Sequence, residues 1–242
     1  MSSAHAILVT NPRDVHAFIH DLKRHGFTAL IGVNTLYRAL LDAPEFAEVD
    51  TRALKLTSAG GMAVQRVVAE RWKQRTGVPI IEAYGLTETS PGAMANRLDI
   101  EDWTGAIGMP LPSTEACILD DHDNEMPIGQ VGEICLRGPQ VMTGYWKRPD
   151  ETAKAFSRDG WLRTGDMAFM DKRGSFKITD RKKDMIVVSG FKVFPNQIED
   201  AVALHPGVAE VAAVGVADER SGEAVKIFVV KKGPRLDRTG LA

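Results

Sequence analysis

The residues best suited to chemistry form a short run of hydroxyl, aromatic and acidic side chains at 84–90, Tyr-Gly-Leu-Thr-Glu-Thr-Ser, directly after an apolar stretch. The ring of Tyr84 could stack on a purine, and the hydroxyls of Thr87 and Thr89 could donate to a phosphate. The carboxylate of Glu88 could hold the magnesium ion that accompanies phosphates. Ligands of open α/β sheets bind beyond the carboxyl ends of strands, so the position suits a binding site. Serine and threonine also gather in loops, and a plain loop explains the run equally well.

A pair of glycines, Gly60 and Gly61, lies within the run Ser-Ala-Gly-Gly-Met at 58–62, between a strand-like and a helix-like stretch. Glycine has no Cβ, so the backbone at such a pair can approach a flat ligand closely. The same pair also suits a tight turn. Taken alone, it is more simply interpreted as one.

A third motif, Asp-Gly-Trp-Leu-Arg-Thr-Gly-Asp at 159–166, ends in a carboxylate beside a hydrophobic strand. Asp166 could accept hydrogen bonds from both hydroxyls of a ribose, a use of carboxylates that recurs in nucleotide sites. The Asp-Gly pair that opens the motif is a turn signal. By itself the segment therefore favours a hairpin.

A dense group of charges follows at 178–185, Ile-Thr-Asp-Arg-Lys-Lys-Asp-Met, between two strand-like stretches and ahead of a Ser-Gly turn at 189–190. Its three adjacent cations could engage a phosphate, and Arg181 could bond to sugar hydroxyls. A solvated linker between two lobes explains the same charges.

The elements that must position these motifs change in character along the chain. Residues 1–104 alternate helix-like and strand-like stretches, which predicts an α/β sheet with parallel strands covered by helices. Asn11 and Pro12 supply a cap and a first-turn proline for the first helix. The predicted helices are one that starts at Pro12 and stops at Gly26, one at 34–41, and one at 64–75 that stops at Gly77. The predicted strands are 27–31, 53–57 and 79–83.

The rest of the chain is richer in strands. Short β-like runs separated by turn residues predict an antiparallel sheet or partial barrel within 105–179, with strands at 116–119, 131–137, 167–170 and 176–179. Beyond Asp180 the pattern is mixed, with strands at 185–188, 208–216 and 224–230 and a helix at 196–204. This shift predicts a lobe boundary near Asp180. Lys231 and Lys232 are interpreted as a solvated strand end.

Composition excludes several classes of function. The 242 residues carry a formal net charge of -2, so no general field attracts nucleic acid. Cys117 and Cys135 lack metal or redox spacing and predict reduced thiols in a cytoplasmic protein. His16 and His20 are spaced as a metal pair but lack a glutamate after His16, which favours a solvent-facing pair. No apolar run is long enough to span a membrane and no signal-peptide pattern occurs, so any membrane contact would be peripheral.

The four motifs, in this order, resemble the adenylate-forming superfamily of acyl-CoA synthetases, luciferases and peptide-synthetase adenylation domains. The segments that look most like bacterial long-chain fatty-acid–CoA ligases are 32–41, 58–76, 84–89, 138–149, 160–166 and 180–229. The resemblance implies that residues 1–179 are the C-terminal part of a large AMP-binding lobe, with an α/β part (1–104) and a β-rich part (105–179). Residues 180–242 would be a small, truncated and mobile α+β lobe.

The resemblance also implies roles for individual residues. Gly60 and Gly61 would border the adenine, on which Tyr84 would stack, and Gly85 belongs to the same cofactor-binding set. Thr87 would bond to the α-phosphate and Glu88 would bind magnesium. Asp166 would hold the ribose hydroxyls with help from Arg181. Asp180 would be the hinge of the small lobe, Gly190 would line the channel for coenzyme A, and 32–41 would wall the acyl pocket.

The implied activity is that of an acid–thiol ligase acting on fatty acid, ATP and coenzyme A. Two elements of the superfamily are not found: a Ser/Thr/Gly-rich loop with a following lysine ahead of Ser58, and a catalytic lysine in the tail. We therefore expect a fragment that is inactive alone and prone to self-association. The alternatives are a ligase for medium-chain or aryl acids and a non-catalytic remnant that binds nucleotide or acyl groups. A homodimer and peripheral binding at the inner face of the membrane are left open.

Overall fold

The structure, a computed structural model, describes residues 5–231 and forms two compact units. Of the described residues, unit 1 comprises 5–114 and 138–142, and unit 2 comprises 115–137 and 143–231. Lys232, predicted to be part of a solvated strand end, lies outside the described residues. The predicted lobe boundary at Asp180 stays a prediction, because compactness divides the chain elsewhere.

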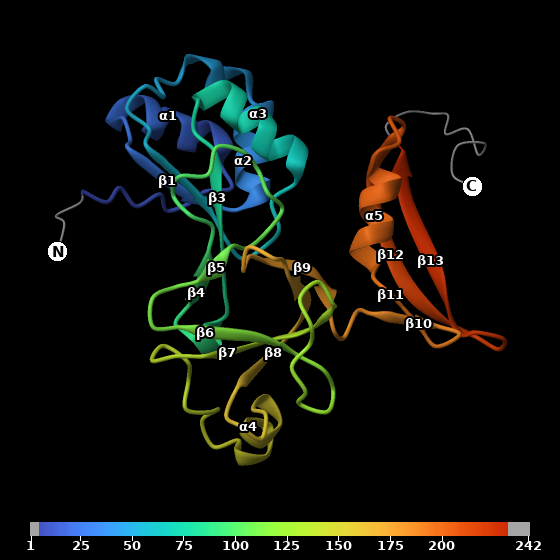
Figure 1. The fold of residues 1–242 in the computed structure, drawn as a ribbon. Coiled ribbons are helices and arrows are strands. Elements are labelled where there is room, and N and C mark those ends of the chain that lie inside the picture. Colours follow the sequence, from blue (N-terminus) through green and yellow to red (C-terminus); the bar gives the residue numbers. More distant parts are fainter. Residues whose placement is uncertain (1–4, 232–242) are drawn as a thin grey trace. The chain divides into compact units, whose positions relative to one another are not determined.

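Unit 1 is an α/β layer built on one five-stranded sheet, shown in blue to green in Figure 1. The strand order is β1-β2-β3-β4-β5, in which the first three strands are parallel and the last two antiparallel. The strands are β1 (Ala29–Gly32), β2 (Leu56–Ala59), β3 (Ile80–Gly85), β4 (Gly92–Ala95) and β5 (Met109–Pro110). The helices are α1 (Val15–His25), α2 (Asn34–Asp42) and α3 (Arg66–Thr76), with short 3-10 turns η1 (Pro44–Glu48) and η2 (Thr87–Thr89).

The three predicted helices of unit 1 are present, but the first begins differently from the prediction. Asp14 caps α1, because its carboxylate accepts a hydrogen bond from the Ala17 N–H at 3.0 Å. Asn11 instead closes a turn through its carbonyl, which accepts the Asp14 N–H. The prediction of an Asn11–Pro12 cap was therefore wrong. An acidic side chain three residues before the N–H that needs a partner is the better cap.

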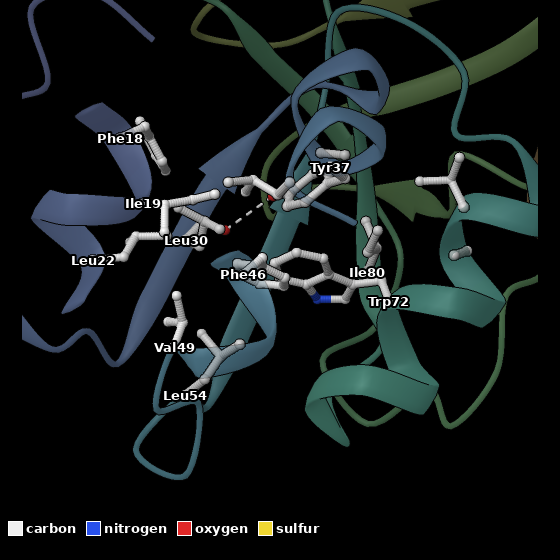
Figure 2. Packing of buried hydrophobic residues seen from close by; sticks show 14 of the residues in the cluster. Phe18, Ile19, Leu22, Leu30, Tyr37, Phe46, Val49, Leu54, Trp72 and Ile80 are labelled. Carbon is white, nitrogen blue, oxygen red and sulfur yellow. Dashed lines mark hydrogen bonds between the residues drawn. The ribbon is translucent and has the colours of Figure 1, made fainter. Parts of the chain in front are cut away.

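The core of unit 1 joins the helices to strand β2. Trp72 of α3 is fully buried, lies edge-on to Tyr37 at 4.8 Å and stacks on Phe46 at 5.5 Å (Figure 2). Its indole N–H donates to the Thr57 hydroxyl at 3.2 Å. The Tyr37 hydroxyl of α2 donates to the Ser58 carbonyl at 2.6 Å. Two helices are thus fixed to the end of β2, from which the glycine pair follows.

Unit 2 contains two antiparallel four-stranded sheets. The first has the order β6-β7-β8-β9 and the second the order β11-β10-β13-β12. The strands of the first are β6 (Glu115–Leu119), β7 (Gly132–Arg137), β8 (Leu162–Met170) and β9 (Phe176–Arg181). The strands of the second are β10 (Ile186–Val188), β11 (Phe191–Val193), β12 (Val208–Asp218) and β13 (Gly222–Lys231). Two helices complete the unit, α4 (Pro149–Ala155) and α5 (Pro195–Ala203).

The two cysteines lie next to each other on neighbouring strands of the first sheet of unit 2, where Cys117 of β6 pairs with Cys135 of β7. Burial raises the pKa of Cys117 to about 11 and that of Cys135 to about 12. Only the thiolate is a strong nucleophile. We expect both thiols to react with an aromatic disulfide reagent at pH 7.5 at least about 100-fold more slowly in the native chain than in denaturant. Rapid labelling of both cysteines in the native protein would contradict this burial.

Candidate functional site

The run at 84–90 lies where strand β3 ends, and its two threonines have different environments. The Thr89 side chain is buried: its hydroxyl accepts the Leu86 N–H at 2.9 Å and donates to the Pro91 carbonyl at 2.8 Å. Thr89 therefore fixes the turn and has no hydroxyl proton left for a phosphate, so the prediction of two phosphate-bonding threonines was wrong for Thr89. Thr87 is exposed and Glu88 is half-buried. The predicted roles of Thr87 with a phosphate and of Glu88 with magnesium stay predictions.

Strands β2 and β3 are parallel neighbours, so the two motifs that follow them lie at one edge of the sheet. A Cβ at Gly60 would lie 3.2 Å from the Ala83 carbonyl of β3, which places the glycine pair beside the strand that carries Tyr84. At Gly85 a Cβ would overlap the Pro91 carbonyl at 1.6 Å, so only glycine permits this close approach of β3 and β4. Tyr84 itself is buried in β3. Adenine stacking on its ring stays a prediction.

In unit 2, two predicted residues form a direct contact. Asp166 of β8 pairs in register with Arg181 of β9, and the Arg181 Nε lies 3.1 Å from the Asp166 Oδ1. The Asp166 carboxylate is 10% exposed and the Arg181 side chain is 52% exposed. An acceptor set into the sheet below a more exposed donor can bond to adjacent hydroxyls of a sugar. We call Asp166 and Arg181 the sugar clamp, after the role that the resemblance implies for them, which stays a prediction.

Asp180 occupies a joint between two elements. Its carboxylate accepts the N–H of Arg181 at 2.8 Å and the N–H of Asn196 at 3.0 Å, which ties β9 to the first turn of α5. Asp180 is 4% exposed. The residue lies at the connection expected of a hinge, and rotation there would have to break or carry along these bonds. The hinge role stays a prediction.

The Ser-Gly pair predicted as a turn is confirmed. Val188 and Phe191 are paired across the β10–β11 hairpin, which leaves a two-residue connection at Ser189 and Gly190. Both residues have positive φ, at 50° and 86°, as the tightest hairpin turns require. The proposed contact of Gly190 with coenzyme A is not tested by this geometry.

The predicted site residues thus form two sets, one in each unit. Gly60, Gly61, Tyr84, Gly85, Thr87 and Glu88 belong to unit 1, and Asp166, Asp180, Arg181 and Gly190 belong to unit 2. Convergence of the two sets on one nucleotide stays a prediction. Residues 5–231 contain no group of three or more acidic, histidine or cysteine side chains placed to hold a metal. A single carboxylate such as Glu88 fits magnesium that is bound mainly by phosphates and water.

Among helices of the described residues, none is long and apolar enough to cross a bilayer.

One buried charged residue of the β-rich part was not among the predicted site residues. Glu133 lies inside strand β7 with its side chain 5% exposed, and its carboxylate contacts the backbone next to Asp166. A carboxylate within an otherwise apolar strand was the available signal, because charged residues are almost never fully buried unless paired.

Comparison with known proteins agrees with this fold. The sequence profile of AMP-binding enzymes matches residues 1–146, and that of the AMP-binding enzyme C-terminal domain matches residues 197–241. The chain belongs to the AMP-binding enzyme family. The predicted fold class, an adenylate-forming α/β lobe with antiparallel β parts and a small α+β lobe, is confirmed.

Three individual relatives show how similar the chain is to proteins of this family. A long-chain-fatty-acid–CoA ligase of Escherichia coli O6:H1 is 57% identical over 235 residues, which cover 97% of this chain and 42% of that protein. Feruloyl-CoA synthase of an Amycolatopsis species is 34% identical over 96% of this chain and 47% of its own length. The solved structure of ATP-bound MatB from Rhodopseudomonas palustris matches with a TM-score of 0.87 at 35% identity, covering 94% of this chain and 45% of that one. The chain spans less than half the length of each of these relatives.

Proposed function

We propose that these residues are part of an ATP-dependent long-chain fatty-acid–CoA ligase and contribute its nucleotide-binding site. The observation that carries the proposal is the 57% identity, over 97% of this chain, to a relative named as a long-chain-fatty-acid–CoA ligase. The position of Thr87 and Glu88 beyond a parallel strand and the sugar clamp on β8 and β9 support it. A ligase for aryl acids is the second candidate, and the 34% identity to feruloyl-CoA synthase supports it less.

The proposed reaction has two steps. A carboxylate oxygen of the fatty acid attacks the α-phosphorus of ATP, and pyrophosphate leaves, giving an acyl-adenylate. The sulfur of coenzyme A then attacks the acyl carbonyl carbon, AMP leaves and the thiol proton is lost. Displacement at a phosphate relies on positioning and on neutralising charge more than on covalent catalysis.

Each residue then has a definite task. The Thr87 hydroxyl donates to a non-bridging oxygen of the α-phosphate, where negative charge grows during the attack. The sugar clamp holds the ribose and so restricts the orientation of the bound nucleotide. Magnesium held by Glu88 and the phosphates would supply further charge neutralisation. Rotation about the connection at Asp180 would replace the groups used in the first step with those used in the second.

The proposal is tested on the purified 242-residue protein by AMP binding and by ATP–pyrophosphate exchange. We expect AMP to bind with a heat release that calorimetry can measure. We expect exchange with palmitate or ferulate to stay near background, since the Ser/Thr/Gly-rich loop and the tail lysine of the superfamily are not found in the 242 residues. Exchange with palmitate would support the ligase and refute inactivity of this chain. Exchange with ferulate alone would favour the aryl-acid ligase. Absence of AMP binding would refute the nucleotide site.

A further inference from the structure

The Glu133 carboxylate collects three donors that come from two different segments. Its Oε2 accepts from the Arg163 guanidinium at 2.7 Å and from the Lys182 ammonium at 3.1 Å. Its Oε1 accepts the backbone N–H of Gly165 at 2.9 Å. Gly165 directly precedes Asp166, and Lys182 directly follows Arg181. One buried carboxylate is therefore bonded next to both members of the sugar clamp.

The Gly165 contact matters because strand β8 is irregular there. Cys135 of β7 pairs with Arg163, whereas Glu133, two residues earlier on β7, pairs with Met167, four residues further on β8. The intervening segment 164–166 bulges out of the ladder, and Gly165 has a left-handed φ of 75°. Bulges often re-aim a side chain near a functional site. Here the Glu133 carboxylate binds the N–H in the middle of the bulge that presents Asp166.

Lys182 connects Glu133 to the end of strand β9 in the same way. Its backbone N–H donates to the Gly165 carbonyl at 2.8 Å, while its ammonium lies 2.6 Å from Asp121 as well as close to Glu133. Burial acts to lower the pKa of Lys182, but its hydrogen bonds to Asp121 and Glu133 raise it overall, so the ammonium stays charged. On the other side, Arg163 also pairs with Asp123. Asp121 and Asp123, in the connection between β6 and β7, thus hold the two cationic partners of Glu133 in place.

We infer that Glu133 is a positioning residue that sets the geometry of the sugar clamp, and this inference rests on the proposed nucleotide site. A buried ion pair contributes little net stability, since desolvation offsets much of the attraction. The three hydrogen bonds to the Glu133 carboxylate instead fix the orientation of the bulge and of the segment that follows Arg181. Glu133 is set back in strand β7, and its effect on nucleotide is exerted through Asp166 and Arg181.

The test is the preference of the protein for AMP over 2′-deoxy-AMP, measured by calorimetry on the full 242-residue chain. A clamp that holds both ribose hydroxyls gives the wild-type protein a preference on the order of 10-fold or more. Glu133→Gln keeps the volume but turns an amide donor toward Arg163 or Lys182. We expect this variant to lower the preference to within about 3-fold, with affinity for 2′-deoxy-AMP changed much less. Lys182→Met, which removes one donor, is expected to lower it by a smaller factor.

Controls separate this effect from loss of structure. Glu115→Gln removes an exposed ion-pair partner of Arg137 from the same sheet and is expected to keep the wild-type preference. Faster hydrogen exchange at the Gly165 amide of Glu133→Gln, with unchanged exchange in the unit 1 core, would show that only the bulge is loosened. A wild-type preference in both Glu133→Gln and Lys182→Met would overturn the inference alone. Equal weakening of both nucleotides would also overturn it. A wild-type chain that binds no AMP would refute the proposed function, and the inference with it.

Discussion

Replacing Asp166 with asparagine is expected to weaken AMP binding by about 10- to 100-fold, because a hydrogen bond to a charged acceptor contributes about 1.5–3 kcal/mol. The substitution preserves the shape of the side chain but removes the charge that faces Arg181 at 3.1 Å. The ribose hydroxyls then meet a weaker acceptor, and the guanidinium loses its partner. Calorimetric titration of AMP into the purified chain measures the effect.

The matched control for this prediction is Asp150→Asn. Asp150 is an exposed acidic residue in the first turn of α4, away from the predicted site residues in sequence. It changes the net charge by the same amount and is expected to leave AMP affinity within about twofold of wild type. Equal affinities for wild type and Asp166→Asn would remove Asp166 from the nucleotide site.

Replacing Trp72 with alanine is expected to lower the free energy of unfolding by about 3–5 kcal/mol, as large-to-small substitutions of buried aromatic residues do. The change removes both aromatic contacts, to Tyr37 and Phe46, and leaves the Thr57 hydroxyl without its indole donor. Because the same core fixes the end of β2, the glycine pair should also become less ordered. Urea unfolding followed by circular dichroism measures the loss.

Trp146→Ala is the control for the core substitution. Trp146 is 87% exposed, so its removal is expected to change the free energy of unfolding by no more than about 0.5 kcal/mol. The two variants delete the same side chain from opposite environments. A loss below about 1 kcal/mol for Trp72→Ala would mean that this core does not determine the stability of unit 1.

The helices and most strands were predictable because their signals are local. α2 starts at Asn34 as predicted, and α3 ends at Gly77, whose left-handed backbone closes the helix. The predictions failed where tertiary pairing decides the structure. α4 buries no residue and so has no apolar period, although Pro149 and the acidic residues after it were a usable start signal. β4 and β5 were missed because they are short and contain glycine, alanine and proline, which do not favour strands.

The site was predictable in its residue types and less so in its supports. Asp166 and Arg181 were predicted to act on the same ribose, and the structure places them in contact. A strand was predicted at 167–170, after a motif that opens on the turn signal Asp-Gly, whereas strand β8 in fact begins at Leu162. Glu133 and Thr89 support the site through bonds across strands or within a turn. Such bonds depend on register and on bulges, which hydrophobic patterns do not encode.

The central claim is that Asp166 and Arg181, the sugar clamp, hold the ribose of a bound nucleotide. A crystal structure of the chain with AMP tests it most directly. We predict that both ribose hydroxyls lie within hydrogen-bond distance of the Asp166 carboxylate, with the Arg181 guanidinium next to them. A nucleotide whose ribose lies away from Asp166, or that binds elsewhere, would contradict the account.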